Sequence, residues 1–281
     1  MTTAEHLAAA RTLLFVPGHR PDRFAKAAAS GADMIILDLE DAVGPQYKEQ
    51  ARANVARYLD DAGPAVVRTN AAGTPWHDAD LAMLGTRACA VMLPKAEDPQ
   101  LLEQLTAQLH LGTPIVPLLE TATGLLHAAA LCACPGVGRA AFGSLDLAAD
   151  LGVDPADRDA LQHARSMVVL ASASCDLPGP IDGVTTTVTD DQAVRADAER
   201  GRRLGFTAKM CIHPSQLAAV RAVFTPSAEQ QEWVRAVLAA ADGSATVLDG
   251  HMIDQPVVTR ARRLLAAAAE PDRDPHEGDT R

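Results

Sequence analysis

Short, largely apolar runs alternate with longer amphipathic stretches along most of this chain. From Arg11 onward, each run is rich in Val, Ile, Leu or Ala and is followed by a stretch whose apolar positions recur at helical spacing. The runs predict buried strands, and the stretches between them predict helices. The expected strands cover residues 12–18, 34–40, 65–70, 90–95, 115–120, 139–145, 180–185 and 206–212.

A helix is expected after each strand. Pro21 and Pro214 stand where two of these helices would begin, a position at which proline is favoured. The expected helices cover residues 21–30, 48–59, 76–84, 99–109, 122–132, 155–174, 190–204 and 214–223. Eight strand–helix pairs without a long interruption predict an α/β fold, the (β/α)8 TIM barrel.

An open, doubly wound sheet is the rival arrangement. Such a sheet rarely needs eight units of similar size, and the sequence lacks the glycine-rich fingerprint of dinucleotide-binding sheets. Gly136 and Gly138 precede a predicted strand, whereas the glycines of that fingerprint follow one. We therefore interpret these glycines as a turn and favour the barrel.

The barrel is expected over residues 11–225. Two further helical patterns, over 227–241 and 256–269, predict a C-terminal helical extension over residues 226–270. A closed barrel does not need this extension, so we expect it to pack on a neighbouring subunit of a homo-oligomer. The polar end, residues 271–281, is expected to be disordered.

Charge and composition narrow the function. The net charge of −11 and the pI of about 5.2 argue against a nucleic acid or an anionic membrane as a partner. The five cysteines lie mostly in apolar surroundings and are expected to be free thiols of a reducing compartment. The first residues lack the basic region and the long apolar run of a signal or membrane span. We therefore expect a cytoplasmic protein.

Two acids, Glu120 and Asp146, each close an apolar run in the middle of the chain. In a TIM barrel the chemistry lies at the carboxyl ends of the strands, so these acids are expected to converge there. Two carboxylates with open positions for water and substrate suit Mg²⁺ or Mn²⁺. The alternative is that they form ion pairs with Arg68 or Lys95.

Further polar residues follow the predicted strands. Arg68 presents a planar fork suited to a substrate carboxylate, although it could also neutralise Glu40 or Asp41. These two acids would either hold metal-bound water or orient Arg68. The remaining strand-end candidates are His19, Arg20, Lys95, Thr185 and His213.

Other roles are predicted for some of these residues and for two further residues, Lys209 and Arg23. Lys95, or Lys209 within the last predicted strand, could form an imine with a carbonyl substrate, a route that the paired acids make the minority interpretation. Arg20, with His19 and Arg23, forms a basic cluster suited to an anionic tail such as a nucleotide phosphate, or simply a solvated surface.

A set of motifs along the chain resembles one family. They are RTLLFVPGHRPDRFAKA, ILDLEDAV, VVRTN, VMLPKAE, LLETATGL, FGSLDLAADLG, GPIDGVTT, GFTAKMCIHPSQ and DGHMIDQPVV. Together they resemble the citrate lyase β-subunit-like lyases of the HpcH/HpaI aldolase superfamily, over nearly all of Arg11–Leu265.

The resemblance implies a Mg²⁺-dependent carbon–carbon lyase in a homotrimer. The substrate would be a 3-hydroxyacyl thioester of coenzyme A or of an acyl carrier, of the citryl, citramalyl or malyl type. The products would be acetyl-CoA and oxaloacetate, pyruvate or glyoxylate. Carried onto this sequence, the family roles make Glu120 and Asp146 the metal ligands and give Arg68 the substrate carboxylate and thioester oxygen. Asp254 would come from the adjacent subunit as acid/base.

The candidate site residues fall into three groups. The expected catalytic residues are Arg68, Asp254, Glu40 and Asp41, the substrate-binding residues are Arg68, Glu120, Lys95 and Arg20, and the metal ligands are Glu120 and Asp146. One alternative function is a metal-dependent 2-oxo-acid aldolase acting on free acids. Another is a β subunit that docks an acyl carrier protein within a citrate lyase complex. The sequence leaves the acyl group open, because pocket shape decides it.

Overall fold

The structure, a computed structural model, describes residues 2–61, 65–157, 159–241, 245–248 and 250–268. The chain divides into two compact units, Met1–Arg221 and Ala222–Arg281, and each is described by itself. The expected disordered tail, residues 271–281, lies outside the described residues. Among the helices that the structure describes, none combines the length and the apolar composition needed to cross a membrane.

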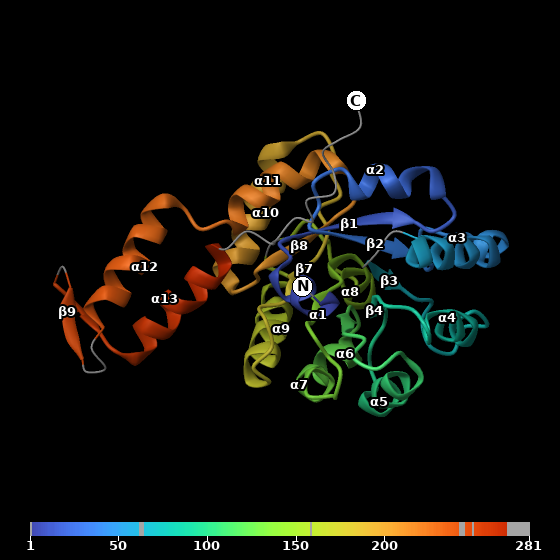
Figure 1. The fold of residues 1–281 in the computed structure, drawn as a ribbon, viewed down its shortest axis with the longest axis horizontal. Coiled ribbons are helices and arrows are strands. Elements are labelled where there is room, and N and C mark those ends of the chain that lie inside the picture. The colour runs from blue at the N-terminus through green and yellow to red at the C-terminus, as the bar shows by residue number, and fades with distance from the viewer. Residues whose placement is uncertain (1, 62–64, 158, 242–244, 249, 269–281) are drawn as a thin grey trace. The chain divides into compact units, whose positions relative to one another are not determined.

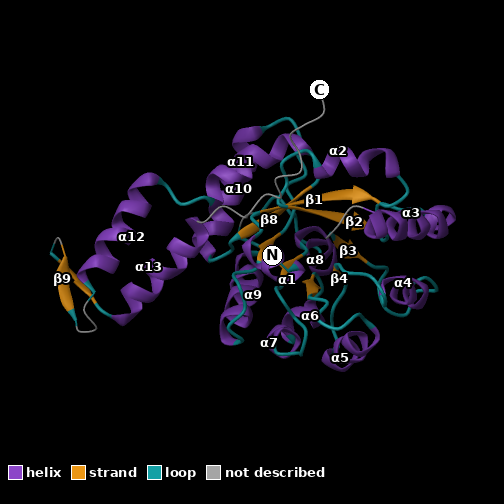
Figure 2. Cartoon of the chain, in the orientation of Figure 1, coloured by secondary structure: helices purple, strands orange, loops and turns teal. Residues whose placement is uncertain are grey.

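The first unit contains a closed barrel of eight parallel strands, which lie in chain order around the ring. Figure 2 shows the strands in orange. The strands are β1 Thr12–Pro17, β2 Met34–Asp38, β3 Val66–Arg68, β4 Ala90–Leu93, β5 Ile115–Leu119, β6 Ala141–Phe142, β7 Ile181–Asp182 and β8 Ala208–Cys211. Pairing of Leu13 in β1 with Met210 in β8 closes the ring. The predicted (β/α)8 barrel is confirmed.

Helices follow the strands of this barrel, and most of them lie around its outside (Figure 1). They are α2 Phe24–Ala28, α3 Lys48–Asp61, α4 His77–Leu84, α5 Pro99–Gln108, α6 Ala122–Leu126, α7 Ala128–Cys132, α8 Ser144–Leu151, α9 Gln162–Ser174, α10 Asp191–Leu204 and α11 Leu217–Phe224. Side chains that cap the backbone define where several of these helices begin. Asp98 accepts a hydrogen bond from the Gln100 amide at the start of α5, and Asp190 accepts one from the Ala193 amide at the start of α10.

The region after β5 differs from the expected elements. The strand expected over 139–145 has only two residues, and α8 begins at Ser144. Asp146 therefore lies in the first turn of a helix rather than at a strand end, a position that the helix dipole favours for an acid. The helix expected over 122–132 is divided at His127, whose Nδ1 contacts the carbonyl oxygen of Glu97.

The helix expected over 155–174 begins only at Gln162. Side chains of two acids bind the local backbone instead, with Asp154 accepting from the Ala156 amide and Asp157 accepting from the Asp159 amide. Such short Asx contacts offer the backbone an alternative to the helix and delay its start.

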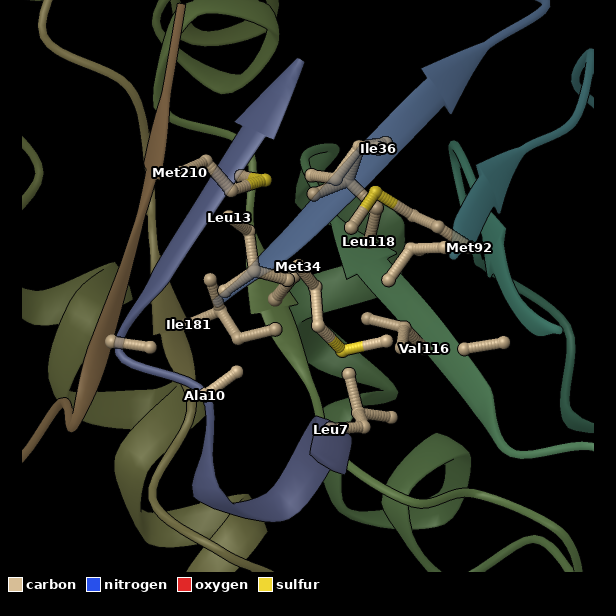
Figure 3. Packing of buried hydrophobic residues seen from close by; sticks show 14 residues of the cluster. Leu7, Ala10, Leu13, Met34, Ile36, Met92, Val116, Leu118, Ile181 and Met210 are labelled. Atoms are coloured by element: carbon tan, nitrogen blue, oxygen red, sulfur yellow. The ribbon is translucent and has the colours of Figure 1, made fainter. Parts of the chain in front are cut away.

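A helix that the periodicity did not predict, α1 Thr3–Ala9, lies at the strand-start end of the barrel. Thr2 and Glu5 cap it through reciprocal hydrogen bonds. Its Leu7 joins the cluster of apolar side chains that fills the barrel, next to Ala10 (Figure 3). The fully buried Arg139 donates to the carbonyl oxygens of Leu7, Ala10 and Gly179 and so ties this helix to the barrel.

The second unit is small and contains α12 Ala228–Ala240, β9 Thr246–Leu248, β10 His251–Ile253 and α13 Gln255–Ala268. The two strands form an antiparallel hairpin. A separate apolar cluster holds the unit together, and it comprises Val234, Val237, Ile253, Val258 and Ala261. The two expected helices are present. Their packing on a neighbouring subunit stays a prediction.

Candidate active site

A cavity of about 890 Å³ lies at the carboxyl ends of the barrel strands, where a TIM barrel places its chemistry. Its wall includes residues that follow six different strands. The charged residues in that wall are Arg20, Asp22, Arg23, Lys26, Asp38, Asp41, Arg68, Glu120 and Asp146. Most of the predicted site residues are thus brought together in one place.

Arg68 at the end of β3 is held by an acid from the neighbouring strand. Its Nε and NH2 groups donate to the two carboxylate oxygens of Asp38, at 2.7 and 2.8 Å. Its guanidinium also lies over the ring of Phe15, 4.9 Å from the ring centroid. Burial opposes the charge of Arg68, but Asp38 outweighs that effect, so the pKa of Arg68 is raised.

The remaining group of Arg68, NH1, is directed to the acids that follow β2. It lies 3.1 Å from Oε2 of Glu40 and 3.8 Å from Oδ2 of Asp41. The geometry at Glu40 is that of an ion pair and not of a hydrogen bond, because Oε2 has no hydrogen-bond partner in the structure. NH1 is therefore the group best placed to contact an anionic ligand.

Lys95 follows β4 and connects acids from three elements. Its Nζ donates to Oε1 of Glu40 at 2.8 Å and lies 3.7 Å from Oδ1 of Asp146. Its backbone amide donates to Oε1 of Glu120 at 2.9 Å. The φ of Lys95 is 48°, a left-handed conformation that costs a non-glycine residue free energy and that often accompanies functional sites.

The pKa of Lys95 bears on its chemistry. Burial lowers this pKa, but the hydrogen bond and the charge of Glu40 outweigh burial and raise it overall. An amine that stays protonated is a poor nucleophile, so the imine route through Lys95 is disfavoured. Lys209 does not belong to the cavity wall. Its Nζ binds Asp197 and the carbonyl oxygen of Gly183 instead.

Glu120 and Asp146, the predicted metal ligands, are two of the acids in the cavity wall. Burial of Glu120 raises its pKa to about 8, and the negative charges of Asp146 and Glu40 add to this rise. Only glycine fits opposite Glu120, because a Cβ on Gly143 would lie 2.4 Å from the Glu120 Oε2 atom. The site thus gathers negative charge that a bound cation would neutralise.

This donor set fits a hard divalent cation. Both carboxylates supply oxygen atoms, and the cavity leaves room for water and substrate oxygens at the other positions. Within the described residues no group of three or more His, Cys, Asp and Glu side chains could hold a metal ion. The two acids would therefore need ligands from water and substrate to complete a magnesium site.

Behind the cavity, a buried lysine fixes the backbone that carries Glu40. Nζ of Lys48 donates to the carbonyl oxygens of Leu39 and Glu40, at 2.6 and 2.8 Å, and to Oδ1 of Asn70. Asn70 in turn donates to Asp80 from its backbone and its side chain. Burial lowers the pKa of Lys48. This network connects the loop that follows β2 to the loop that follows β3.

Two other candidates lie at the edge of the site or outside it. Arg20 is part of the cavity wall, but its guanidinium forms a half-exposed ion pair with Asp22 at 2.9 Å. Asp254 belongs to the second unit, where it precedes α13 and accepts a hydrogen bond from the Val257 amide at 3.3 Å. Its catalytic role stays a prediction.

Three residues that shape the site were not among the predicted ones. Asp38 was taken as part of a strand, yet it orients Arg68, while Lys48 and Gly143 support Glu40 and Glu120 from behind. Asp38 could have been identified as the inward-pointing acid of this segment, because side chains alternate between the two faces of a strand. The partners of Lys48 and Gly143 are distant in sequence and leave no local signal.

A closed (β/α)8 barrel with two carboxylates and an acid-paired arginine in the cavity at its mouth has the features of TIM-barrel proteins whose site lies at the carboxyl ends of the strands. The chain belongs to the HpcH/HpaI aldolase/citrate lyase family, whose model matches residues 11–214. The resemblance in the sequence motifs is thereby confirmed.

Individual relatives are similar along almost the whole chain. A citrate lyase subunit beta-like protein of Mycobacterium tuberculosis is 39% identical over 267 residues, which cover 92% of this chain and 95% of the relative. A (3S)-malyl-CoA thioesterase of Cereibacter sphaeroides is 36% identical over 270 residues, which cover 92% of this chain and 94% of that protein.

A solved structure is also similar. It is the CitE protein of Mycobacterium tuberculosis in complex with magnesium, acetoacetate and coenzyme A, with a TM-score of 0.79 and 36% sequence identity. The alignment covers 94% of this chain and 100% of that chain.

Proposed function

We propose that this protein is a Mg²⁺-dependent carbon–carbon lyase. Its substrate would be a 3-hydroxyacyl thioester, and its products acetyl-CoA and a 2-oxo acid. The observation that carries the proposal is the placement of Glu120 and Asp146 in the same cavity wall as Arg68. Magnesium is proposed because this donor set suits it and because the similar CitE protein was solved with magnesium, acetoacetate and coenzyme A.

In this proposal Glu120 and Asp146 would hold Mg²⁺. The metal would supply Lewis acidity, which lowers the pKa of the substrate hydroxyl and polarises the adjoining carboxylate. Arg68 would use NH1 to stabilise the negative charge that develops on the thioester oxygen when the carbon–carbon bond breaks. Asp38 would keep that guanidinium in place, since it occupies Nε and NH2.

Glu40 and Lys95 would set the charge around the reacting atoms. Burial of Glu40 raises its pKa, and its contacts with Arg68 and Lys95 oppose that rise. Asp254 of an adjacent subunit would accept the proton of the substrate hydroxyl and return it to the enolate carbon of the departing acetyl group. The exposed Arg23 and Lys26, with the half-exposed Arg20, would bind the anionic end of a coenzyme A or carrier-bound handle.

The test is metal-dependent turnover with the purified protein. Thioester cleavage is followed with Mg²⁺, after EDTA treatment, and after Mg²⁺ is restored. We expect activity to disappear with EDTA and to return with the metal, and Glu120→Gln to bind Mg²⁺ at least tenfold more weakly by calorimetry. Activity that persists in EDTA, or in Glu120→Gln without Mg²⁺ binding, would refute the proposed role of the metal.

Thioester hydrolysis is a second candidate, because a relative that is 36% identical is a (3S)-malyl-CoA thioesterase. The same cavity could bind the same class of substrate for both reactions. The two reactions differ in their products, since hydrolysis releases free coenzyme A and an intact hydroxy acid. Product analysis therefore separates them.

A further inference from the structure

The cavity wall has two chemically different arcs. Acids and a cation lie along the arc from β2 to α8, and they are Asp38, Asp41, Arg68, Glu120 and Asp146. Glu40 and Lys95, which are not among the lining residues, form ion pairs with Arg68 and Asp146. Apolar side chains lie along the arc from β7 through β8 to β1, and they are Val184, Met210, Ile212 and Phe15. Because β8 pairs with both β7 and β1, this apolar arc is continuous.

The apolar arc continues downward into the barrel core. Phe15 and Val184 are partly buried and pack against the cluster that contains Leu118 and Met210, and all four line the cavity. Phe15 also touches the charged arc, because Arg68 lies over its ring. A substrate whose carboxylate faces Arg68 and the two acids would therefore place its next substituent against this apolar surface.

We infer that the hydroxyl-bearing carbon of the substrate carries, besides the carboxylate and the thioester arm, only hydrogen or a short alkyl group. The acid released would then be a monocarboxylic 2-oxo acid, and citryl-type substrates with an additional carboxymethyl group would be rejected. This inference rests on the proposed lyase function and adds the substrate class to it.

A second carboxylate would be unfavourable on the apolar arc for two reasons. It would lose hydration against side chains that cannot donate hydrogen bonds. It would also lie beside a site where Glu40, Asp41, Glu120 and Asp146 already concentrate negative charge. A methyl group in the same place would only remove apolar surface from water.

The other cations of the cavity wall do not relieve this cost. Among the described residues that line the cavity, those on the β1 side are Arg20, Arg23 and Lys26. Arg23 and Lys26 are exposed at the rim, and Arg20 is paired with Asp22. His213 is likewise exposed at the mouth, where its Nδ1 contacts Ser215. A carboxymethyl group directed at the buried part of the arc would meet none of them.

The test compares substrates and product acids. Purified enzyme with Mg²⁺ is given malyl-, citramalyl- and citryl-CoA, and the binding of pyruvate, 2-oxobutanoate and oxaloacetate is measured by calorimetry. We expect kcat/KM for citramalyl-CoA to exceed that for citryl-CoA at least tenfold, since one group in an apolar pocket changes kcat/KM by about 10- to 200-fold. The two monocarboxylic acids should bind more tightly than oxaloacetate.

A variant pair checks that the apolar arc is the cause. Val184→Thr keeps the shape of the side chain and adds a hydroxyl group, so the preference for citramalyl-CoA should fall severalfold. Val188→Thr, at an exposed position outside the cavity wall, should leave the preference unchanged. An unchanged preference in Val184→Thr would contradict the assignment of this wall.

Thioester cleavage tests the proposed lyase function, whereas the preference among substrates and acids tests this inference, so the two can fail separately. Cleavage with a preference for citryl-CoA would overturn the inference and leave the lyase. A binding preference for the monocarboxylic acids without cleavage of any thioester would support the apolar wall and overturn the lyase. Equal or tighter binding of oxaloacetate, or binding of none of the three acids, would overturn the inference.

Discussion

Arg68, the side chain that we propose contacts the substrate, is oriented by a second side chain, Asp38. Arg68 presents NH1 to the cavity because Asp38 occupies its Nε and NH2 groups. Asp38 is itself fixed by the backbone amides of Glu40 and Ala42, which donate to its two oxygens. Each oxygen of this buried acid therefore accepts two hydrogen bonds, which a neutral amide in its place would not reproduce.

The role of Asp38 predicts a kinetic effect. Asp38→Asn should lower kcat by about 10- to 100-fold, because the guanidinium of Arg68 would no longer be aligned. Steady-state kinetics and a thermal melt would measure the effect and check the fold. Asp60→Asn is the matched control, since Asp60 accepts the same pair of hydrogen bonds from Arg87 on the surface. Wild-type kcat in a folded Asp38→Asn protein would contradict the positioning role.

Gly143 gives a second prediction at the residue scale. Its φ of −96° is open to alanine, so only the close approach of Glu120 excludes a Cβ. Gly143→Ala should displace the Glu120 carboxylate and weaken Mg²⁺ binding about 10- to 100-fold by calorimetry. Gly44→Ala is the control, because its Cβ would meet the flexible end of Gln46. Equal Mg²⁺ affinity in both variants would argue against Glu120 as a ligand.

Sequence reasoning located the site residues better than their partners. Glu120 and Arg68 were predicted because a charge at the end of an apolar run is conspicuous and barrel strand ends converge. The bidentate contact of Arg68 with Asp38 and the reach of Lys95 to Glu40 were not predicted. Such contacts depend on the stagger between neighbouring strands, which the pattern of one strand does not contain.

At the scale of elements, the strands were predicted well and some helix starts were not. All eight strands are present where apolar runs stand, although most are shorter than their runs. The whole of α8 was missed, because residues 139–145 were expected to be strand and the next helix was expected only from 155; α8 begins at Ser144, directly after Gly143, whose backbone lies against Glu120. The Asx contacts of Asp154 and Asp157 delay α9. Both effects come from local contacts of the backbone, which the spacing of apolar residues does not reveal.

A buried pair between α10 and β8 predicts how stability depends on pH. Asp197 accepts hydrogen bonds from Lys209 at 2.7 Å and Thr185 at 2.6 Å. Burial alone would raise the pKa of Asp197, but the charge of Lys209 and these hydrogen bonds lower it. A lowered folded-state pKa gives stabilisation that is present above the ordinary pKa of about 3.9 and is lost as pH falls through the lower value.

Asp197→Asn should therefore lower the free energy of unfolding by about 1–3 kcal/mol at pH 7, since the buried Lys209 would keep only its longer ion pair with Asp182, at 3.8 Å. The difference from wild type should shrink below about pH 4. Urea unfolding at several pH values would measure it. Asp60→Asn, at an exposed pair, should cost less than about 1 kcal/mol. A pH-independent difference for Asp197→Asn would show that charge is not the cause.

At the scale of the molecule, the chain carries a second unit that the barrel does not need to close. This unit has its own apolar cluster and holds Asp254 at the start of α13. The prediction that Asp254 serves the site of an adjacent subunit, in a homotrimer, gives the unit a function. If it is correct, two different inactive chains could form a complete site together.

Mixing two inactive variants tests this directly. Asp254→Asn and Arg68→Ala should each be inactive alone and should regain part of the activity when they are unfolded together and reassembled. Mixed oligomers contain some sites with an intact Arg68 from one chain and an intact Asp254 from the other. Each variant reassembled with itself is the control. Mixed oligomers without regained activity would contradict the shared site.

The central claim is that this cavity breaks a carbon–carbon bond and does not merely hydrolyse a thioester. The most direct measurement is the mass of the products formed from a 3-hydroxyacyl-CoA such as citramalyl-CoA in the presence of Mg²⁺. We expect acetyl-CoA and a 2-oxo acid in equal amounts from the wild-type protein, and neither product from Glu120→Gln. Free coenzyme A with the intact hydroxy acid as the only products would contradict it and assign the protein to thioester hydrolysis.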